Sequence, residues 1–175
     1  MPLTALLQSA CIRESKIKEN HIGVLVDYNK IKKPKEHLLL FRTDESHEFH
    51  DDFLPRLTKK PSPKCCDGLV LYINTENTKY PLTICFVELK GKNVNEAVEQ
   101  VLQTYKPIRT YLIAAGISES KIKWKAVVIS SGGCSKKKDA GVKPLMDIFN
   151  KNKENNVLYH VARDKTFPIT DFITA

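Results

Sequence analysis

Three residues in the middle of the chain carry side chains that could together hydrolyse a phosphodiester. Asp67 precedes the apolar run Leu69-Val70-Leu71, and a second apolar run, starting at Leu82, ends in Glu88-Leu89-Lys90. Side chains two apart in a strand point to the same face, so Glu88 and Lys90 should emerge together. Two carboxylates at the ends of adjacent strands suit a divalent cation, and an ammonium group suits a phosphate. The pattern therefore predicts metal-assisted hydrolysis of a phosphodiester.

These side chains must be positioned by a β-hairpin and by the helix that follows it. Strands are expected over 67–73 and 82–89, and the polar link between them is short enough for an antiparallel hairpin. Asn93 is a good N-cap, and apolar residues recur at helical spacing from Val94 onward, with a kink or break expected at Pro107. Such a helix permits a parallel crossover to the next strand.

The flanking segments complete an α/β pattern. The further elements expected are a helix over 3–18, strands over 22–28 and 37–42, helical positions within 43–57, a strand over 124–129, a helix over 142–149 and a strand over 157–162. No internal repeat or long linker divides the 175 residues, so we expect a single domain over 1–175. The predicted fold class is α/β, with a mixed β-sheet flanked by helices.

This order of motifs resembles the PD-(D/E)XK nuclease superfamily, which includes type II restriction enzymes, Holliday junction resolvases and many defence nucleases. Asp67 opens one strand, Glu88-x-Lys90 ends the next, and a helix carrying Gln100 follows. The resemblance covers about 65–129 and implies a restriction endonuclease-like core, in the order helix-strand-strand-strand-helix-strand. Cys66 stands where the name of the superfamily has proline.

The resemblance also implies a role for each residue. Asp67, Glu88 and the backbone carbonyl of Leu89 would ligate Mg²⁺ or Mn²⁺. Lys90 would orient the attacking water or stabilise charge on the phosphate, and Gln100 would point towards the site. Glu14 is the candidate for the acidic residue that many members carry on their first helix. Two alternatives stay open: Glu88 and Lys90 as an ordinary ion pair, and Gln100 as a solvated residue beside an apolar stripe.

The charge of the chain agrees with a nucleic-acid partner. Lysine and arginine outnumber aspartate and glutamate by 28 to 20, which gives a net charge of +8 and favours a polyanion. The lysines that could grip phosphates from loops are Lys35, Lys64, Lys92, Lys136, Lys137 and Lys138. The alternative is that these lysines simply keep their loops soluble.

Composition also bears on the compartment. The five cysteines show no CxxC spacing, so we expect reduced thiols and a cytoplasmic protein. No apolar segment approaches the ~20 residues that span a bilayer. The apolar patch near the N-terminus has no basic leader, so neither a membrane partner nor a signal peptide is expected.

Together these features predict a metal-dependent endonuclease that hydrolyses DNA, with a role in defence or in recombination and repair by family analogy only. One chain offers one active site, so cutting both strands would need a homodimer or two events. An RNase, or a nuclease subunit directed by a partner, would keep the chemistry and change the substrate. A non-catalytic nucleic-acid-binding module with the same fold is the alternative from another class.

Overall fold

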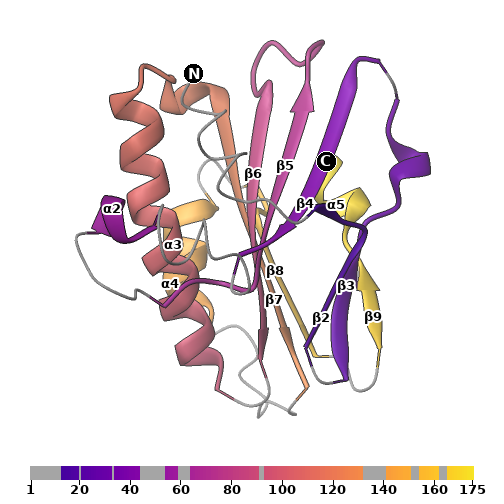
Figure 1. The fold of residues 1–175 in the computed structure, drawn as a ribbon, viewed down its shortest axis with the longest axis vertical. Coiled ribbons are helices and arrows are strands. Elements are labelled where there is room, and N and C mark those ends of the chain that lie inside the picture. The colour runs from indigo at the N-terminus through magenta and orange to yellow at the C-terminus, as the bar shows by residue number, and fades with distance from the viewer. Residues whose placement is uncertain are drawn as a thin grey trace.

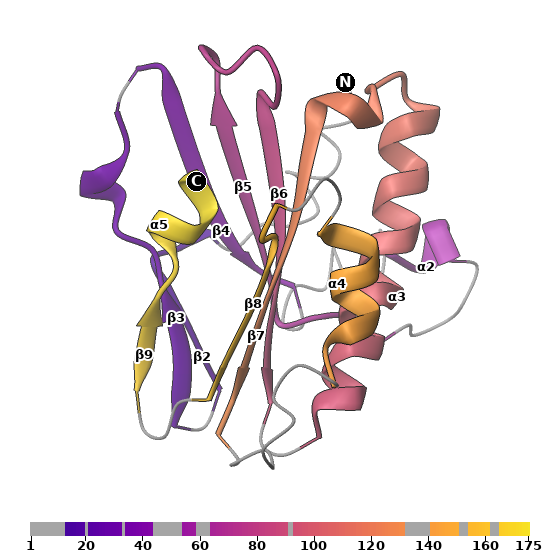
Figure 2. The same ribbon diagram turned by 180° about the vertical axis from the view of Figure 1, so that it is seen from behind.

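The described part of the chain has three layers: helices, a central sheet, and a smaller sheet on the opposite face (Figure 1). A computed structural model gives the structure of residues 13–19, 21–32, 34–43, 54–58, 64–90, 93–131, 141–150, 154–161 and 165–175. Figure 2 shows the same three layers from behind. The architecture is mixed α/β, as the sequence predicts.

The central sheet has six strands, in the order β1-β4-β5-β6-β7-β8. Their bounds are Arg13–Glu14 (β1), Glu36–Arg42 (β4), Gly68–Asn74 (β5), Leu82–Lys90 (β6), Ile122–Ser130 (β7) and Val157–Val161 (β8). Strands β1, β4, β5 and β6 pair antiparallel, whereas β6, β7 and β8 pair in parallel. β6 and β7 are buried along almost their whole length, as expected for strands covered on both faces. The predicted hairpin and the parallel strand after it are confirmed.

The helical layer consists of α2 (Leu54–Thr58), α3 (Val94–Ala114) and α4 (Lys143–Phe149). Helix α3 begins where the Asn93 side chain accepts a hydrogen bond from the Glu96 amide at 3.2 Å, which satisfies a helix-terminal N–H. It then links the end of β6 to the start of β7. An aromatic cluster packs between this layer and the sheet, with ring centroids 4.8–6.2 Å apart: Phe86, Tyr105, Trp124 and Phe149.

Pro107 lies inside α3, and the helix continues through it as one element. Of the kink or break predicted at this proline, the break is therefore wrong. Tyr105 and Ile108, on either side of the proline, are both buried in the core beneath the helix. This packing holds both halves of α3 against the sheet, and it outweighs the local cost of a missing N–H donor.

The opposite face of the central sheet is covered by β2 (Lys16–Glu19), β3 (Ile22–Leu25), β9 (Thr166–Pro168) and the short helix α5 (Thr170–Thr174). β3 pairs with β9 in parallel, so segments from opposite ends of the chain lie side by side. Ile17 approaches the start of β5 so closely that a Cβ on Gly68 would lie 2.3 Å from its Cδ1 atom. Glycine at position 68 therefore permits this contact between the two sheets.

The N-terminal helix predicted over 3–18 is wrong where the structure describes it. Arg13–Glu14 and Lys16–Glu19 are strands, and residues 1–12 lie outside the described part. Ile17 is buried and Lys18 is exposed, which is the alternation of a strand rather than the spacing of a helix.

The other predicted strands and helices agree more closely with the structure. The strand predicted over 22–28 ends at Leu25 and is followed by a 3₁₀ turn at Tyr28–Lys30. The strand over 37–42 and the elements over 142–149 and 157–162 correspond to β4, α4 and β8. Of the helical positions within 43–57, only those from Leu54 onward are described, and they form α2.

No helix in the described ranges is both long and apolar enough to cross a membrane.

Candidate functional site

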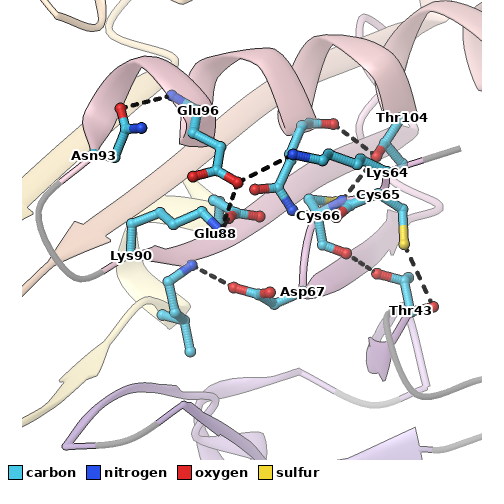
Figure 3. A network of polar contacts seen from close by, with 12 residues as sticks. Thr43, Lys64, Cys65, Cys66, Asp67, Glu88, Lys90, Asn93, Glu96 and Thr104 are labelled. Atoms are coloured by element: carbon cyan, nitrogen blue, oxygen red, sulfur yellow. Dashed lines mark hydrogen bonds and ion pairs between the residues drawn. The ribbon is translucent and has the colours of Figure 1, made fainter.

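The β5–β6 hairpin brings Asp67 and Glu88 together. Gly68 pairs with Val87 in the antiparallel register, so Asp67 and Glu88 stand opposite each other one residue beyond that pair. A carboxylate oxygen of Asp67 accepts a hydrogen bond from the backbone N–H of Leu89 at 2.5 Å. This bond fixes the Asp67 side chain beside β6, and Figure 3 shows it next to Glu88.

Glu88 and Lys90 emerge on the same face of β6, as their spacing predicts. The Lys90 ammonium nitrogen lies 3.3 Å from Glu88 Oε1, and the Glu88 side chain is fully buried. Neither oxygen of the Glu88 carboxyl group has a hydrogen-bond partner among the described residues. Within the described structure, the Lys90 ammonium and, to a smaller extent, the Asp67 backbone oppose the cost of burying this acid.

Burial governs the ionisation of Glu88. It raises the pKa of this carboxyl to about 9, and the negative charge of Asp67 adds to the effect while Lys90 opposes it. Burial alone would lower the pKa of Lys90, but Glu88, Glu96 and Asp67 raise it above its usual value. Lys90 therefore stays an ammonium ion, which stabilises negative charge rather than accepting a proton.

The segment before Asp67 is held against helix α3 by one polar residue from each of three successive turns. Lys64 lies 3.3 Å from Glu96, and Gln100 Nε2 donates to the Cys65 carbonyl at 2.9 Å. The Cys66 amide donates to Thr104 Oγ1, also at 2.9 Å. Residues 96, 100 and 104 share one face of the helix because residues four apart are neighbours. This polar ladder sets the position at which Asp67 enters the site.

Two further contacts hold the same segment from the side of β4. The Thr43 hydroxyl donates to the Cys66 carbonyl, and the Thr43 amide donates to the Asp67 carbonyl at 3.1 Å.

The side chain of Cys66 is fully buried, and burial raises the pKa of its thiol well above the usual value. It therefore packs as a small, neutral residue, and its thiol donates a hydrogen bond to the Gly68 carbonyl at 3.3 Å.

The sequence analysis missed Glu96, Thr104 and Thr43. Glu96 also lies 3.9 Å from Lys90, so it connects Lys90 to Lys64 in one chain of charges (Figure 3). The signal that could have found two of them is the spacing of Glu96, Gln100 and Thr104 along α3. Nothing in the local sequence marks Thr43, because its partners lie more than 20 residues away in the chain.

The donor set present fits Mg²⁺ or Mn²⁺. Two buried carboxyl groups face one another, and among the described residues Glu88 lacks the hydrogen bonds that a buried carboxyl normally makes. The described residues contain no group of three or more histidine, cysteine or acidic side chains that could hold a metal ion. Magnesium sites commonly use one or two carboxylates and complete their shell with water and substrate phosphate. Asp67 and Glu88 would therefore leave most of the coordination shell of such an ion to water and a substrate phosphate.

The other predicted site residues are distributed as follows. The backbone of Glu14 lies on β1, paired with Leu40, and not on a helix; its expected place on a first helix is wrong. Lys64 lies beside the site, paired with Glu96.

Lys35 lies far from the site. It precedes β4 and pairs with Glu76 at the opposite end of β5, roughly 20 Å from Asp67 at the rise of a strand. Lys92, Lys136, Lys137 and Lys138 lie outside the described residues.

Comparison of the chain with protein-family models, with curated proteins and with solved structures gives no match.

Proposed function

We propose that this protein is a metal-dependent nuclease that hydrolyses phosphodiester bonds of DNA at the site formed by Asp67, Glu88 and Lys90. The observation that carries the proposal is the fully buried Glu88 carboxyl group. Neither of its oxygens has a hydrogen-bond partner in the described structure, and it faces a second carboxylate. Such an arrangement is costly in a protein without a cation, and the Lys90 ammonium beside it is suited to a phosphate.

The topology around the site supports a restriction endonuclease-like core. Three antiparallel strands, β4, β5 and β6, are followed by helix α3 and by β7, which is parallel to β6. This order equals the strand-strand-strand-helix-strand part of the superfamily core. The positions of Asp67 just before β5 and of Glu88-x-Lys90 at the end of β6 support the same proposal.

Each residue has a defined task in this proposal. Asp67, Glu88 and the Leu89 carbonyl would hold the cation. When bound, Mg²⁺ or Mn²⁺ would act as a Lewis acid and make water a better nucleophile. Lys90 carries a positive charge next to the metal ligands and stabilises the charge that develops on the phosphate. Gln100 holds the backbone before Asp67 and is a positioning residue, because its amide group binds the Cys65 carbonyl.

The test is cleavage of supercoiled plasmid DNA with Mg²⁺ or Mn²⁺ by the wild type, Asp67→Asn and Lys90→Met. We expect metal-dependent nicking or linearisation that falls by at least about 100-fold in both variants, because electrostatic groups at a reaction centre contribute on this scale. Asp147→Asn and Lys106→Met are matched controls, since both side chains are exposed, on α4 and on α3 respectively. Both control proteins should cut like the wild type.

A parallel assay separates the alternatives. An RNA of the same sequence as a DNA oligonucleotide tests the RNase, because cleavage of RNA alone would replace the DNA substrate while keeping the site. Binding of nucleic acid without cleavage of either substrate would favour a non-catalytic module. Cleavage that survives both substitutions would show that the active site lies elsewhere.

A further inference from the structure

One carboxylate oxygen lies between two lysines at the edge of the proposed nuclease site. Glu96 Oε1 lies 3.3 Å from the ammonium nitrogen of Lys64 and 3.9 Å from that of Lys90. Within the described residues, the Glu96 carboxylate has no other ion-pair or hydrogen-bond partner. The three side chains come from the segment before β5, the end of β6 and the first turn of α3, and Figure 3 shows them converging beside Glu88.

The Glu96 carboxylate is held in this position only by its attraction to the two lysines. The side chain of Lys64 is 64% exposed and that of Glu96 is 35% exposed, and exposed ion pairs contribute little stability because water and salt screen them. The start of α3 does not depend on this carboxylate, since the Asn93 side chain accepts a hydrogen bond from the Glu96 backbone N–H. The Glu96 side chain can therefore turn towards solvent and release both ammonium groups without disturbing the helix.

The position between the two ammonium groups suits a phosphate. A phosphodiester carries the same single negative charge as a carboxylate, and lysine ammonium groups bind phosphate oxygens well. Helix α3 is 21 residues long, so the partial positive charge at its N-terminus adds to the attraction. Lys90 also lies 3.3 Å from Glu88, which places this position next to the proposed metal ligands.

We propose that Glu96 occupies a phosphate-binding position in the free protein, and that a backbone phosphate of DNA displaces it to bind between Lys64 and Lys90, an inference that rests on the nuclease function proposed above. Glu96 is then a competing anion and not a metal ligand. A DNA strand compensates the loss of the Glu96 contacts through its other phosphates, which a free phosphate ion cannot do. The Glu96 carboxylate therefore favours a polymer over small anions.

The affinity for DNA in EDTA tests this without cleavage. Fluorescence anisotropy of a labelled DNA duplex compares the wild type with Glu96→Gln, which removes the competing charge and keeps the size of the side chain. We expect Glu96→Gln to bind about fivefold more tightly or better, because a like charge within about 4 Å of the phosphate is gone. The plot of log affinity against log salt concentration should steepen by about 1, as for one further phosphate contact. Loss of a merely structural contact would weaken binding instead.

Two further variants tie the gain in affinity to this position. Glu99→Gln makes the same charge change at an exposed residue of α3 and should raise the affinity less than about twofold, because salt screens a charge away from the contact. In a Lys64→Met background, Glu96→Gln should give a smaller gain, since one of the two ammonium groups is missing. Thermal unfolding checks that each variant is folded.

The outcomes separate this phosphate-binding position from the nuclease activity. The proposal is overturned if Glu96→Gln binds no more tightly than Glu99→Gln, if Lys64→Met leaves the gain unchanged, or if none of the proteins binds the duplex. A gain in affinity without plasmid cleavage would support the phosphate-binding position and reject the nuclease. Plasmid cleavage without a gain in affinity would reject the displacement of Glu96 alone.

Discussion

Glu88 is the residue at which stability and proposed function oppose each other. A carboxyl group with no exposed surface and no hydrogen-bond partner in the described structure is destabilising when it is ionised. Its pKa is raised to about 9, chiefly by burial. The folded protein without metal therefore holds a proton that the unfolded chain releases at a much lower pH.

The sign of the resulting pH dependence follows from linkage. Between the usual glutamate pKa of 4.5 and the folded value of about 9, the folded state binds more protons. Stability of the metal-free protein therefore falls as pH rises through this window. We expect Glu88→Gln to raise the free energy of unfolding at pH 8 by about 2–4 kcal/mol and to change it little at pH 5. Thermal unfolding in EDTA at the two pH values measures this.

A matched substitution and an added cation sharpen that comparison. Glu99→Gln makes the same chemical change on an exposed residue of α3. It should leave the melting temperature unchanged at both pH values. Mg²⁺ should raise the melting temperature of the wild type more than that of Glu88→Gln, because ligand binding stabilises the state that binds it. A Glu88→Gln protein whose stability differs from that of the wild type by the same amount at both pH values, or that is less stable at pH 8, would contradict the raised pKa of Glu88.

At the scale of the element, helix α3 does more than cover the sheet. Its first three turns present Glu96, Gln100 and Thr104 to the segment that leads into β5. Thr104 is fully buried, and it also donates to the Gln100 carbonyl at 2.9 Å. Its hydroxyl therefore joins the helix to the residue before Asp67.

We expect Thr104→Val to loosen the position of Asp67 while it preserves the shape of the core. The change leaves the buried Cys66 N–H without its acceptor, which costs about 1–3 kcal/mol. Chemical denaturation should show this loss, and the affinity for Mg²⁺ measured by calorimetry should fall as well. Thr110→Val is the control, because that threonine makes the same helix-backbone contact on the exposed face. A stability loss with unchanged Mg²⁺ affinity would give Thr104 a purely structural role.

The sequence could predict the elements that rest on local patterns. The β5–β6 hairpin, α3 and β7 follow from apolar runs and one N-cap, and the two-residue spacing places Glu88 and Lys90 on one face. The strands around Ile17 and Phe167 were not predictable in this way. They are four and three residues long, and β9 forms by pairing with β3, more than 140 residues away. Leu3, Leu6 and Leu7 set a helical spacing, and extending it to Ile17 led to the wrong prediction.

For the site, the sequence pointed to Asp67, Glu88 and Lys90 but not to the contacts that hold them in place. The Asp67–Leu89 hydrogen bond and the Thr104–Cys66 contact depend on the register of the hairpin and on how α3 lies across it. Neither the register of the hairpin nor the position of α3 can be read from a short sequence motif. The distant position of Lys35 was missed for the same reason, since only strand pairing shows which end of the sheet a loop occupies.

At the scale of the whole molecule, Lys125 joins the central sheet to the layer behind it. It lies on β7 opposite Cys85, is 1% exposed, and donates to the Phe172 carbonyl of α5. Its ammonium nitrogen also lies 4.7 Å from the centre of the Phe172 ring. Burial, assisted by the charge of Lys123, lowers the pKa of Lys125 to about 8, against the smaller opposing effects of Cys85 and Glu154.

This buried ammonium predicts a second pH dependence, of opposite sign to that of Glu88. Below about pH 8, Lys125 is charged in both states, and the cost of burying the charge is fully present. Between about 8 and the usual value of 10.5, the unfolded chain binds more protons, so this contribution to stability rises with pH. We expect Lys125→Met to be more stable than the wild type at pH 7, by an amount that shrinks by up to about 3 kcal/mol towards pH 10.

Urea denaturation of both proteins at pH 7, 8 and 10 measures that difference. Taking the difference removes groups common to both proteins, such as the buried thiol of Cys85. Lys106→Met, an exposed change on α3, should show no trend with pH. A constant gap between the wild type and Lys125→Met would mean that the ammonium is solvated.

The register of the β5–β6 hairpin also bears on the order in which the chain folds. The hairpin closes a short loop and forms from local contacts, whereas the parallel pairing of β6 with β7 must wait for the long crossover through α3. Asp67 and Glu88 therefore meet early, while both are still hydrated. Glu88 loses its water only when α3 docks over the sheet, so its burial belongs to a late step. Replacing it with glutamine should then slow unfolding and leave the refolding rate almost unchanged.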